Sequence, residues 1–162
     1  MTSPSKSALL AALQSQRQHV IGIVDGLSER DLTQPVLPSG WTCLGLIRHL
    51  ALDVERFWFR AVIAGEQVEL VTGDAAWQVP DGVGSTEILA LYQHETARAD
   101  AVIAATTLDT PPAWWPPDLF DRPLADLAEA MLHVLAETAT HAGHLDAARE
   151  LIDGRTWLVL TD

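Results

Sequence analysis

Residues 42–65 read TCLGLIRHLALDVERFWFRAVIAG and form the most hydrophobic long segment of the chain. Thr42 has a side chain that commonly caps a helix N-terminus, and Gly65 has the backbone freedom with which many helices end. Apolar residues cover most of the circumference between them, as is typical of a helix inside a protein core. Because Arg48 and Asp53 interrupt the run, it falls short of the roughly 20 apolar residues that a membrane-spanning helix needs.

Three further segments have the periodicity of long helices, at residues 5–26, 85–107 and 124–153, with Ser85 or Thr86 as the expected N-cap of the second of them. Most of the proline and glycine lies between these segments, which predicts loops there. Four long helices without any strand pattern favour an all-α fold, and we expect a four-helix bundle.

Composition places limits on the function. The 162 residues are 48% hydrophobic, enough for one domain over residues 1–162 with a core of its own. The net charge is −12 and Lys6 is the only lysine, so nucleic acids and anionic membranes would be repelled. One cysteine and no signal-peptide pattern predict a cytoplasmic protein.

The last predicted helix carries a stripe of groups that can bind metal or transfer protons. His133, Glu137, His141 and His144 are separated by four, four and three residues. At the angular step of an α-helix they fall within a sector roughly 80° wide, next to an apolar face. The stripe is therefore expected to face a cleft between helices.

His49 lies in the apolar segment at residues 42–65, where a neutral imidazole needs a hydrogen-bond partner or a metal ion. A lone buried histidine, or a lone Glu and His pair one turn apart, is usually structural. Helix bundles, however, build metal sites from carboxylates and histidines on facing helices. We therefore predict that His49, Glu137 and His141 bind a divalent ion, with zinc first and nickel, iron or manganese as alternatives.

Three protein ligands leave coordination positions open, which indicates catalysis or ligand binding. His144 could add a fourth contact, bind substrate or act as a base, and Asp53 could orient His49, transfer a proton or remain in water. His133 is expected to lie outside the ligand set. Cys43 could be a nucleophile near a helix N-terminus or, more commonly for such a residue, a small buried side chain.

Two regions outside the helices are candidates for further roles. The segment at residues 108–123 holds Trp114 and Trp115 among prolines, and this pair either covers the core or lines a pocket. The apolar tail at residues 155–162 is expected to pack on the bundle or on a second subunit. We also expect a homodimer, because one bundle would leave part of the segment at residues 42–65 uncovered.

Two stretches resemble the hallmark segments of the DinB/YfiT-like superfamily: LPSGWTCLGLIRHLALDVERFWF at residues 37–59 and HVLAETATHAGHLDAARELIDG at residues 133–154. The resemblance implies a bundle with an up-down-down-up arrangement and a divalent metal held at the positions of His49, Glu137 and His141. Glutamate at the second position resembles the N-terminal domain of the mycothiol-dependent maleylpyruvate isomerases.

The resemblance also implies a function. The expected activity is transfer of a low-molecular-weight thiol, such as mycothiol or bacillithiol, to a small electrophilic substrate, with His144 or Asp53 moving a proton. A metal-containing protein that binds a ligand or acts in a stress response without catalysis is one alternative. Metal-assisted hydrolysis, which needs no thiol, is the other.

Overall fold

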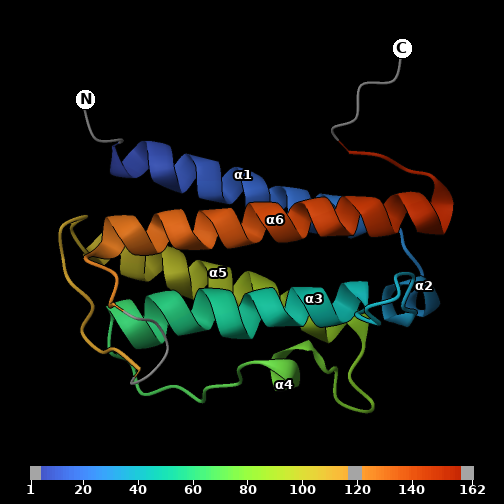
Figure 1. Cartoon of the computed structure of the whole chain (residues 1–162), viewed down its shortest axis with the longest axis horizontal. Helices are drawn as coiled ribbons and strands as arrows, with labels where there is room; N and C mark the ends of the chain where they lie inside the picture. Colours follow the sequence, from blue (N-terminus) through green and yellow to red (C-terminus); the bar gives the residue numbers. More distant parts are fainter. Residues whose placement is uncertain (1–4, 117–121, 158–162) are drawn as a thin grey trace.

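The computed structural model describes residues 5–116 and 122–157, and all regular structure in these residues is helical. In chain order the helices are α1 (Lys6–Val24), α2 (Glu29–Thr33), α3 (Cys43–His49), η1 (Leu50–Ile63), α4 (Asp74–Trp77), α5 (Ser85–Ala105) and α6 (Leu127–Asp153). Since η1 directly continues α3, the long helices are α1, α3 with η1, α5 and α6. Helices α1 and α6 run in one direction and the other two in the opposite direction (Figure 1), so the predicted up-down-down-up bundle is confirmed.

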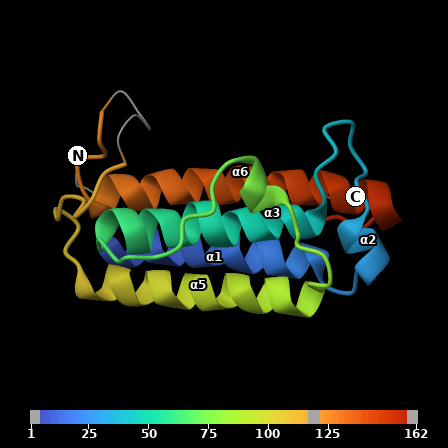
Figure 2. The same cartoon turned by 90° about the horizontal axis from the view of Figure 1, so that it is seen from below.

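The four long helices share one core. α1 packs along α6 and α5 packs along η1, and all four lie side by side along one axis (Figure 2). Leu13, Phe59, Ile103 and Leu145, one from each long helix, are fully buried. Within the described residues, none of the helices combines the length and apolar character needed to cross a bilayer.

The second long helix changes its hydrogen bonding at Leu50. The first part, α3, is an α-helix, whereas Leu50–Ile63 is a π-helix, in which each N–H bonds to the carbonyl five residues earlier. Neither Gly nor Pro occurs between Leu50 and Ile63, so no residue type marks the change. Because π-helical segments are often found at functional sites, the position of this change directly after His49 is relevant to the site described below.

The bundle covers the apolar face of this helix by itself. Phe57, Trp58 and Phe59 are all buried within the single chain, as are the flanking aliphatic residues. Incomplete coverage of residues 42–65 therefore gives no reason to expect a second subunit, and the homodimer stays a prediction.

Several helix ends differ from the predicted ones because of the hydrogen bonds made there. α5 has Gly84 as its N-cap: the Gly84 N–H donates to Glu87 of the same helix at 3.0 Å, and the Ser85 N–H donates to Glu29 of α2 at 3.0 Å. α6 begins three residues later than predicted, because the Asp126 carboxylate accepts from the N–H of Glu129. The predicted loops on either side of residues 42–65 contain the short helices α2 and α4.

An ion pair is buried between α1 and η1. Arg17 donates two hydrogen bonds to the carboxylate of Glu55, at 2.7 and 2.6 Å, and a third to Asp100 of α5. Glu55 is fully buried and Arg17 is 6% exposed. The pair links three of the four long helices.

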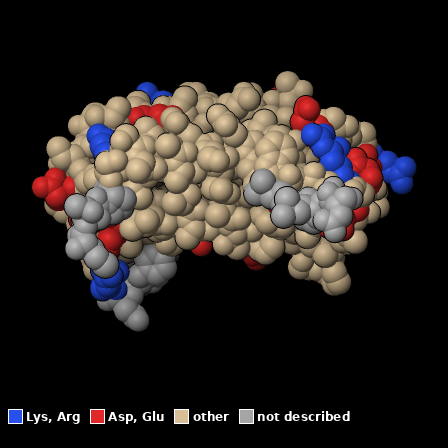
Figure 3. Space-filling model, turned by 90° about the horizontal axis from the view of Figure 1, so that it is seen from above, with Lys and Arg blue, Asp and Glu red and all other residues tan. Residues whose placement is uncertain are grey.

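Charge is unevenly distributed over the surface. On the face formed by α1 and α6, the middle of the molecule is uncharged and the charged side chains lie toward the ends (Figure 3). The only charged residue between Ser7 and Val24 is Arg17, which is buried. The part of α1 in the middle of this face therefore adds no exposed Asp, Glu, Lys or Arg to it.

The C-terminal tail contacts α1 as far as the structure describes it. The indole of Trp157 stacks on His19 with the ring centroids 5.1 Å apart, and Arg155 donates to the carbonyl of Asp25. Packing on the bundle is thus observed for residues 155–157. The rest of the predicted tail, residues 158–162, lies outside the described residues.

Gly45 allows the segment that carries α4 to lie against α3. A Cβ atom added at Gly45 would overlap the carbonyl oxygen of Trp77. We expect Gly45→Ala to lower the free energy of unfolding by about 1–3 kcal/mol, because backbone must move to make room. Urea denaturation followed by circular dichroism measures this.

A matched control for this substitution is available in α6. Gly143 is also helical, and a Cβ added there meets nothing within 4 Å. Gly143→Ala should leave stability unchanged or raise it by up to about 1 kcal/mol. Equal stability of the two alanine variants would contradict the proposed close approach at Gly45.

Candidate metal centre

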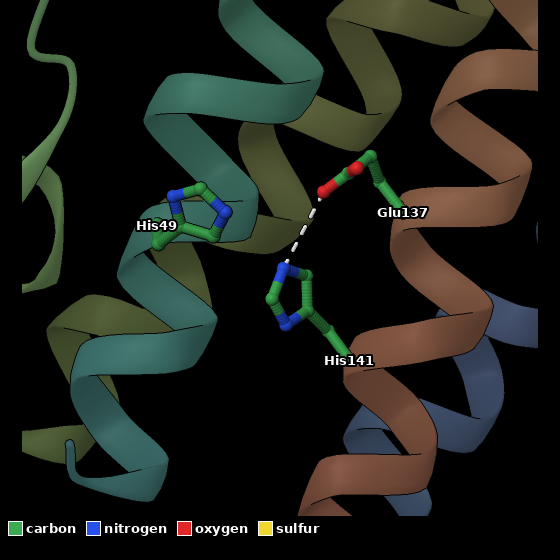
Figure 4. Close-up of side chains that lie close together, drawn as sticks. All are labelled: His49, Glu137 and His141. Carbon is green, nitrogen blue, oxygen red and sulfur yellow. Dashed lines mark ion pairs between the residues drawn. The ribbon is translucent and has the colours of Figure 1, made fainter. Parts of the chain in front are cut away.

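Three of the predicted site residues come together between α3 and α6. His49 is the last residue of α3, and Glu137 and His141 lie one turn apart on α6 and point toward it (Figure 4). One ligand atom from each lies within 4.8 Å of the others. His49 is buried, and the other two are half-buried. Two imidazole nitrogens and a carboxylate oxygen form a donor set that divalent transition metals accept.

Nδ1 of His49 lies on the side of the ring that faces away from Glu137 and His141 (Figure 4). This nitrogen is buried and has no hydrogen-bond partner in the described part of the chain. The nearest carboxylate oxygen is Oδ2 of Asp53, at 3.4 Å. The same oxygen accepts a hydrogen bond from the Gly73 N–H at 3.2 Å. Asp53 thus connects the imidazole of His49 to the segment that precedes α4.

Asp53 therefore lies where a carboxylate orients a metal-binding histidine, on the ring nitrogen opposite the metal. A group in this place acts through His49 and does not reach a substrate bound among the three ligands. Of the roles considered for Asp53, the geometry favours orientation of the imidazole over proton transfer.

The ring of His49 is also covered by Trp77 of α4. The two rings stack with centroids 4.4 Å apart and planes 14° apart. Arg48 fixes α4 in this place by donating to the carbonyls of Ala75 and Ala76, at 2.6 and 3.0 Å. Trp77 was not predicted as part of the site, because no local sequence pattern indicates a contact with a residue 28 positions earlier.

His141 is neutral at pH 7, as a metal-binding imidazole must be. Burial lowers the pKa of His141 to about 4, and the electrostatic interaction with His49 acts in the same direction. Glu137, whose Oε2 lies 3.5 Å from Nε2 of His141, opposes the shift.

The other two histidines of the stripe flank this group. His144 is exposed, with its Nδ1 3.4 Å from Nδ1 of His141, and lies at the rim. The ring of His133 lies 4.5 Å from that of Trp58 and outside the group of three ligands. Burial lowers the pKa of His133.

The tryptophans of the proline-rich segment lie near the C-terminal end of η1. The ring of Trp115 lies 5.9 Å from that of Trp58, and the Trp58 ring in turn lies 4.5 Å from that of His133. Trp114 lies 6.4 Å from Phe57 and lines a pocket of about 150 Å³. Residues 117–121 of this segment lie outside the described residues.

Cys43 is a buried side chain and not a nucleophile. It is 2% exposed, and burial raises the pKa of its thiol to about 11. The thiolate that a nucleophile requires is therefore scarce at neutral pH.

We expect Asp53→Ala to weaken divalent metal binding by about 10- to 100-fold, because His49 loses the carboxylate that orients it. Titration of the metal-free protein with zinc in competition with a chelating dye gives the affinity. Asp53→Asn is the matched control: it keeps an acceptor for Gly73 and for the imidazole and should lose less. Unchanged affinity in Asp53→Ala would refute the orienting role.

A family model described as MST, mycothiol-S-transferase, matches residues 8–154. No curated protein and no solved structure matches the chain. The matched residues include the whole of the cluster formed by His49, Glu137 and His141.

Proposed function

Because the chain belongs to the mycothiol-S-transferase family, a DinB/YfiT-like family, we propose that it is a metal-dependent enzyme that transfers mycothiol, or a closely related thiol, to a small electrophile. The metal dependence in this proposal rests on one observation: ligand atoms of His49, Glu137 and His141, which come from two helices, lie within 4.8 Å of one another.

The residues present fit a divalent ion. The donor set is two imidazole nitrogens and one carboxyl oxygen, and the buried Nδ1 of His49 faces Asp53 as a metal-bound imidazole does. Zinc is the ion we expect, while nickel, iron and manganese accept the same donors. When bound, such an ion supplies Lewis acidity that lowers the pKa of a thiol.

The protein's own groups have separate tasks in this proposal. His49, Glu137 and His141 hold the ion, and Asp53 keeps His49 in the orientation that it needs. His144, exposed at the rim, accepts the proton that the thiol loses and passes it to solvent. The sulfur then forms a bond to the electrophilic carbon, and the leaving group departs with the electron pair of the broken bond. Trp115, which is half-buried and lies 5.9 Å from the buried Trp58, offers an apolar surface for the electrophile.

The test is product formation with and without thiol. Protein purified without a histidine tag and loaded with zinc is incubated with mycothiol and monochlorobimane, and the thioether is quantified by mass spectrometry. Transfer above the uncatalysed rate, lost after chelation and restored by zinc, is the expected result. Consumption of an electrophile without thiol would instead indicate a hydrolase. Mycothiol binding without any turnover would indicate a binding protein.

A further inference from the structure

A pocket of about 400 Å³ opens beside the proposed metal ligands, between α4 and the residues that lead into α3. Two of its walls are tryptophans that each contact a histidine of the site. Trp77 stacks on His49, and the ring of Trp41 lies 6.2 Å from that of His144. A pocket in this position can hold the part of a substrate that lies beyond its sulfur atom. Its size is within the range of small-molecule sites.

Polar groups line the rest of this pocket. Its lining residues are Ser39, Gly40, Trp41, Thr42, Asp74, Trp77 and Gln78. The hydroxyl of Thr42 caps α3, but the side chains of Ser39, Asp74 and Gln78 make no hydrogen bond to any residue in 5–116 or 122–157. Hydroxyl, carboxylate and amide groups beside indole rings suit a hydroxylated ring, whose C–H face packs on the indole and whose hydroxyls bond to the polar groups.

The charge of the pocket is negative. Among the residues that the structure describes, Asp74 is the only charged one in the lining. The neighbouring cation, Arg48, is directed to the carbonyls of Ala75 and Ala76, where it holds α4. With a net charge of −12 on the whole chain, a carboxylate or phosphate entering the pocket would be repelled.

We propose that this pocket binds the uncharged, polyhydroxylated end of the thiol substrate, and that Asp74 selects against thiols with carboxylates at that end. The inference rests on the proposed function. Mycothiol and bacillithiol serve as probes, because both join cysteine to glucosamine; the cysteine amine is acetylated in mycothiol and free in bacillithiol, a difference that is the same for every protein variant compared. The far end is a neutral inositol in mycothiol and a malate with two carboxylates in bacillithiol.

Binding of the S-methyl derivatives of these two thiols tests the pocket without requiring turnover. Isothermal titration calorimetry on the zinc-loaded protein should show tighter binding of S-methylmycothiol. Trp41→Ala should lower the affinity for S-methylmycothiol by about tenfold. Trp41→Phe keeps an aromatic face and should therefore lower this affinity by a smaller factor. Unchanged affinity in a folded Trp41→Ala protein would overturn the assignment.

The selectivity of Asp74 has its own test. Asp74→Asn should narrow the preference for S-methylmycothiol over S-methylbacillithiol by about threefold, since a partly exposed charge contributes modestly. Asp81→Asn removes the same charge from the same connecting segment but outside the pocket lining, and should keep the wild-type preference. If the ratio of the affinities for the two S-methyl thiols is the same in Asp74→Asn and in Asp81→Asn, Asp74 does not select between them.

These outcomes separate the pocket from the proposed function. Wild-type protein that binds S-methylmycothiol through Trp41 but transfers no thiol would refute the transferase and leave the pocket intact. Wild-type protein that transfers mycothiol normally while neither Trp41→Ala nor Asp74→Asn changes binding would refute the pocket alone. Failure of the wild type to bind S-methylmycothiol at millimolar concentration would also refute the pocket.

Discussion

His141→Ala is expected to lower the affinity for zinc at least about 100-fold and to reduce thiol transfer to the uncatalysed rate. Two donors would remain, Nε2 of His49 and the carboxylate of Glu137, and two donors hold a zinc ion weakly. The measurement is a zinc titration in competition with a chelator, followed by the turnover assay on the same preparation.

His133→Ala is the matched control for this prediction. It removes the same side chain from the same helix, two turns before His141 and outside the three-ligand cluster. Its zinc affinity should equal that of the wild type. A His141→Ala protein that binds zinc as tightly as His133→Ala would remove His141 from the ligand set.

Glu55→Leu is expected to lower the free energy of unfolding by about 3–5 kcal/mol, because it leaves the guanidinium of Arg17 buried without its main partner. Burial raises the pKa of the Glu55 carboxyl and the charge of Arg17 opposes this shift, so the carboxylate depends on Arg17 to remain charged, whereas Arg17 stays charged and needs a counter-ion. Urea denaturation followed by circular dichroism gives the difference.

The double variant Arg17→Met with Glu55→Leu separates loss of the pair from loss of packing. Removing both charges should restore most of the stability, since no uncompensated charge stays in the core. Asp100, the third member, is about one-third exposed and can be solvated when Arg17 is gone. If Glu55→Leu alone loses less than about 1 kcal/mol, the pair does not have the structural role proposed for it.

The helices and the core of the site could be predicted because both depend on local periodicity. Glu137 and His141 are four residues apart, a spacing that places them on one helix face wherever the helix packs. The apolar residues around His49 require that this helix faces the core, and in a four-helix bundle the core is shared with α6. Short-range spacing and hydrophobicity were therefore enough to place the three side chains together.

The surroundings of the site depend on contacts between distant residues, which leave no periodic pattern. Trp77 covers His49 only because Arg48 and Gly45 allow α4 to dock on α3. At the N-terminus of α5, the Ser85 N–H bonds to Glu29, 56 residues earlier, while Glu87 accepts locally from the Gly84 N–H. The start of α6 was readable in the sequence and was missed: Asp126 and Glu129 form a local capping pattern there.

The change from α- to π-helix after His49 was also not predicted from the sequence. A helical wheel drawn at 3.6 residues per turn does not apply to Leu50–Ile63, because each hydrogen bond spans one more residue there. His49 itself lies in α3, where the α-helical spacing of 3.6 residues per turn applies. The prediction of the ligand cluster was therefore unaffected by it.

Metal content per chain, measured by plasma mass spectrometry, tests the central claim most directly. The wild type, purified without a histidine tag, is compared with His49→Ala and Glu137→Ala, which remove one ligand from each of the two helices. We predict close to one divalent ion per wild-type chain after zinc reconstitution and almost none in either variant. A wild type that stays without metal after reconstitution, or variants that retain it, would contradict the proposed metal centre and the metal-dependent thiol transfer built on it.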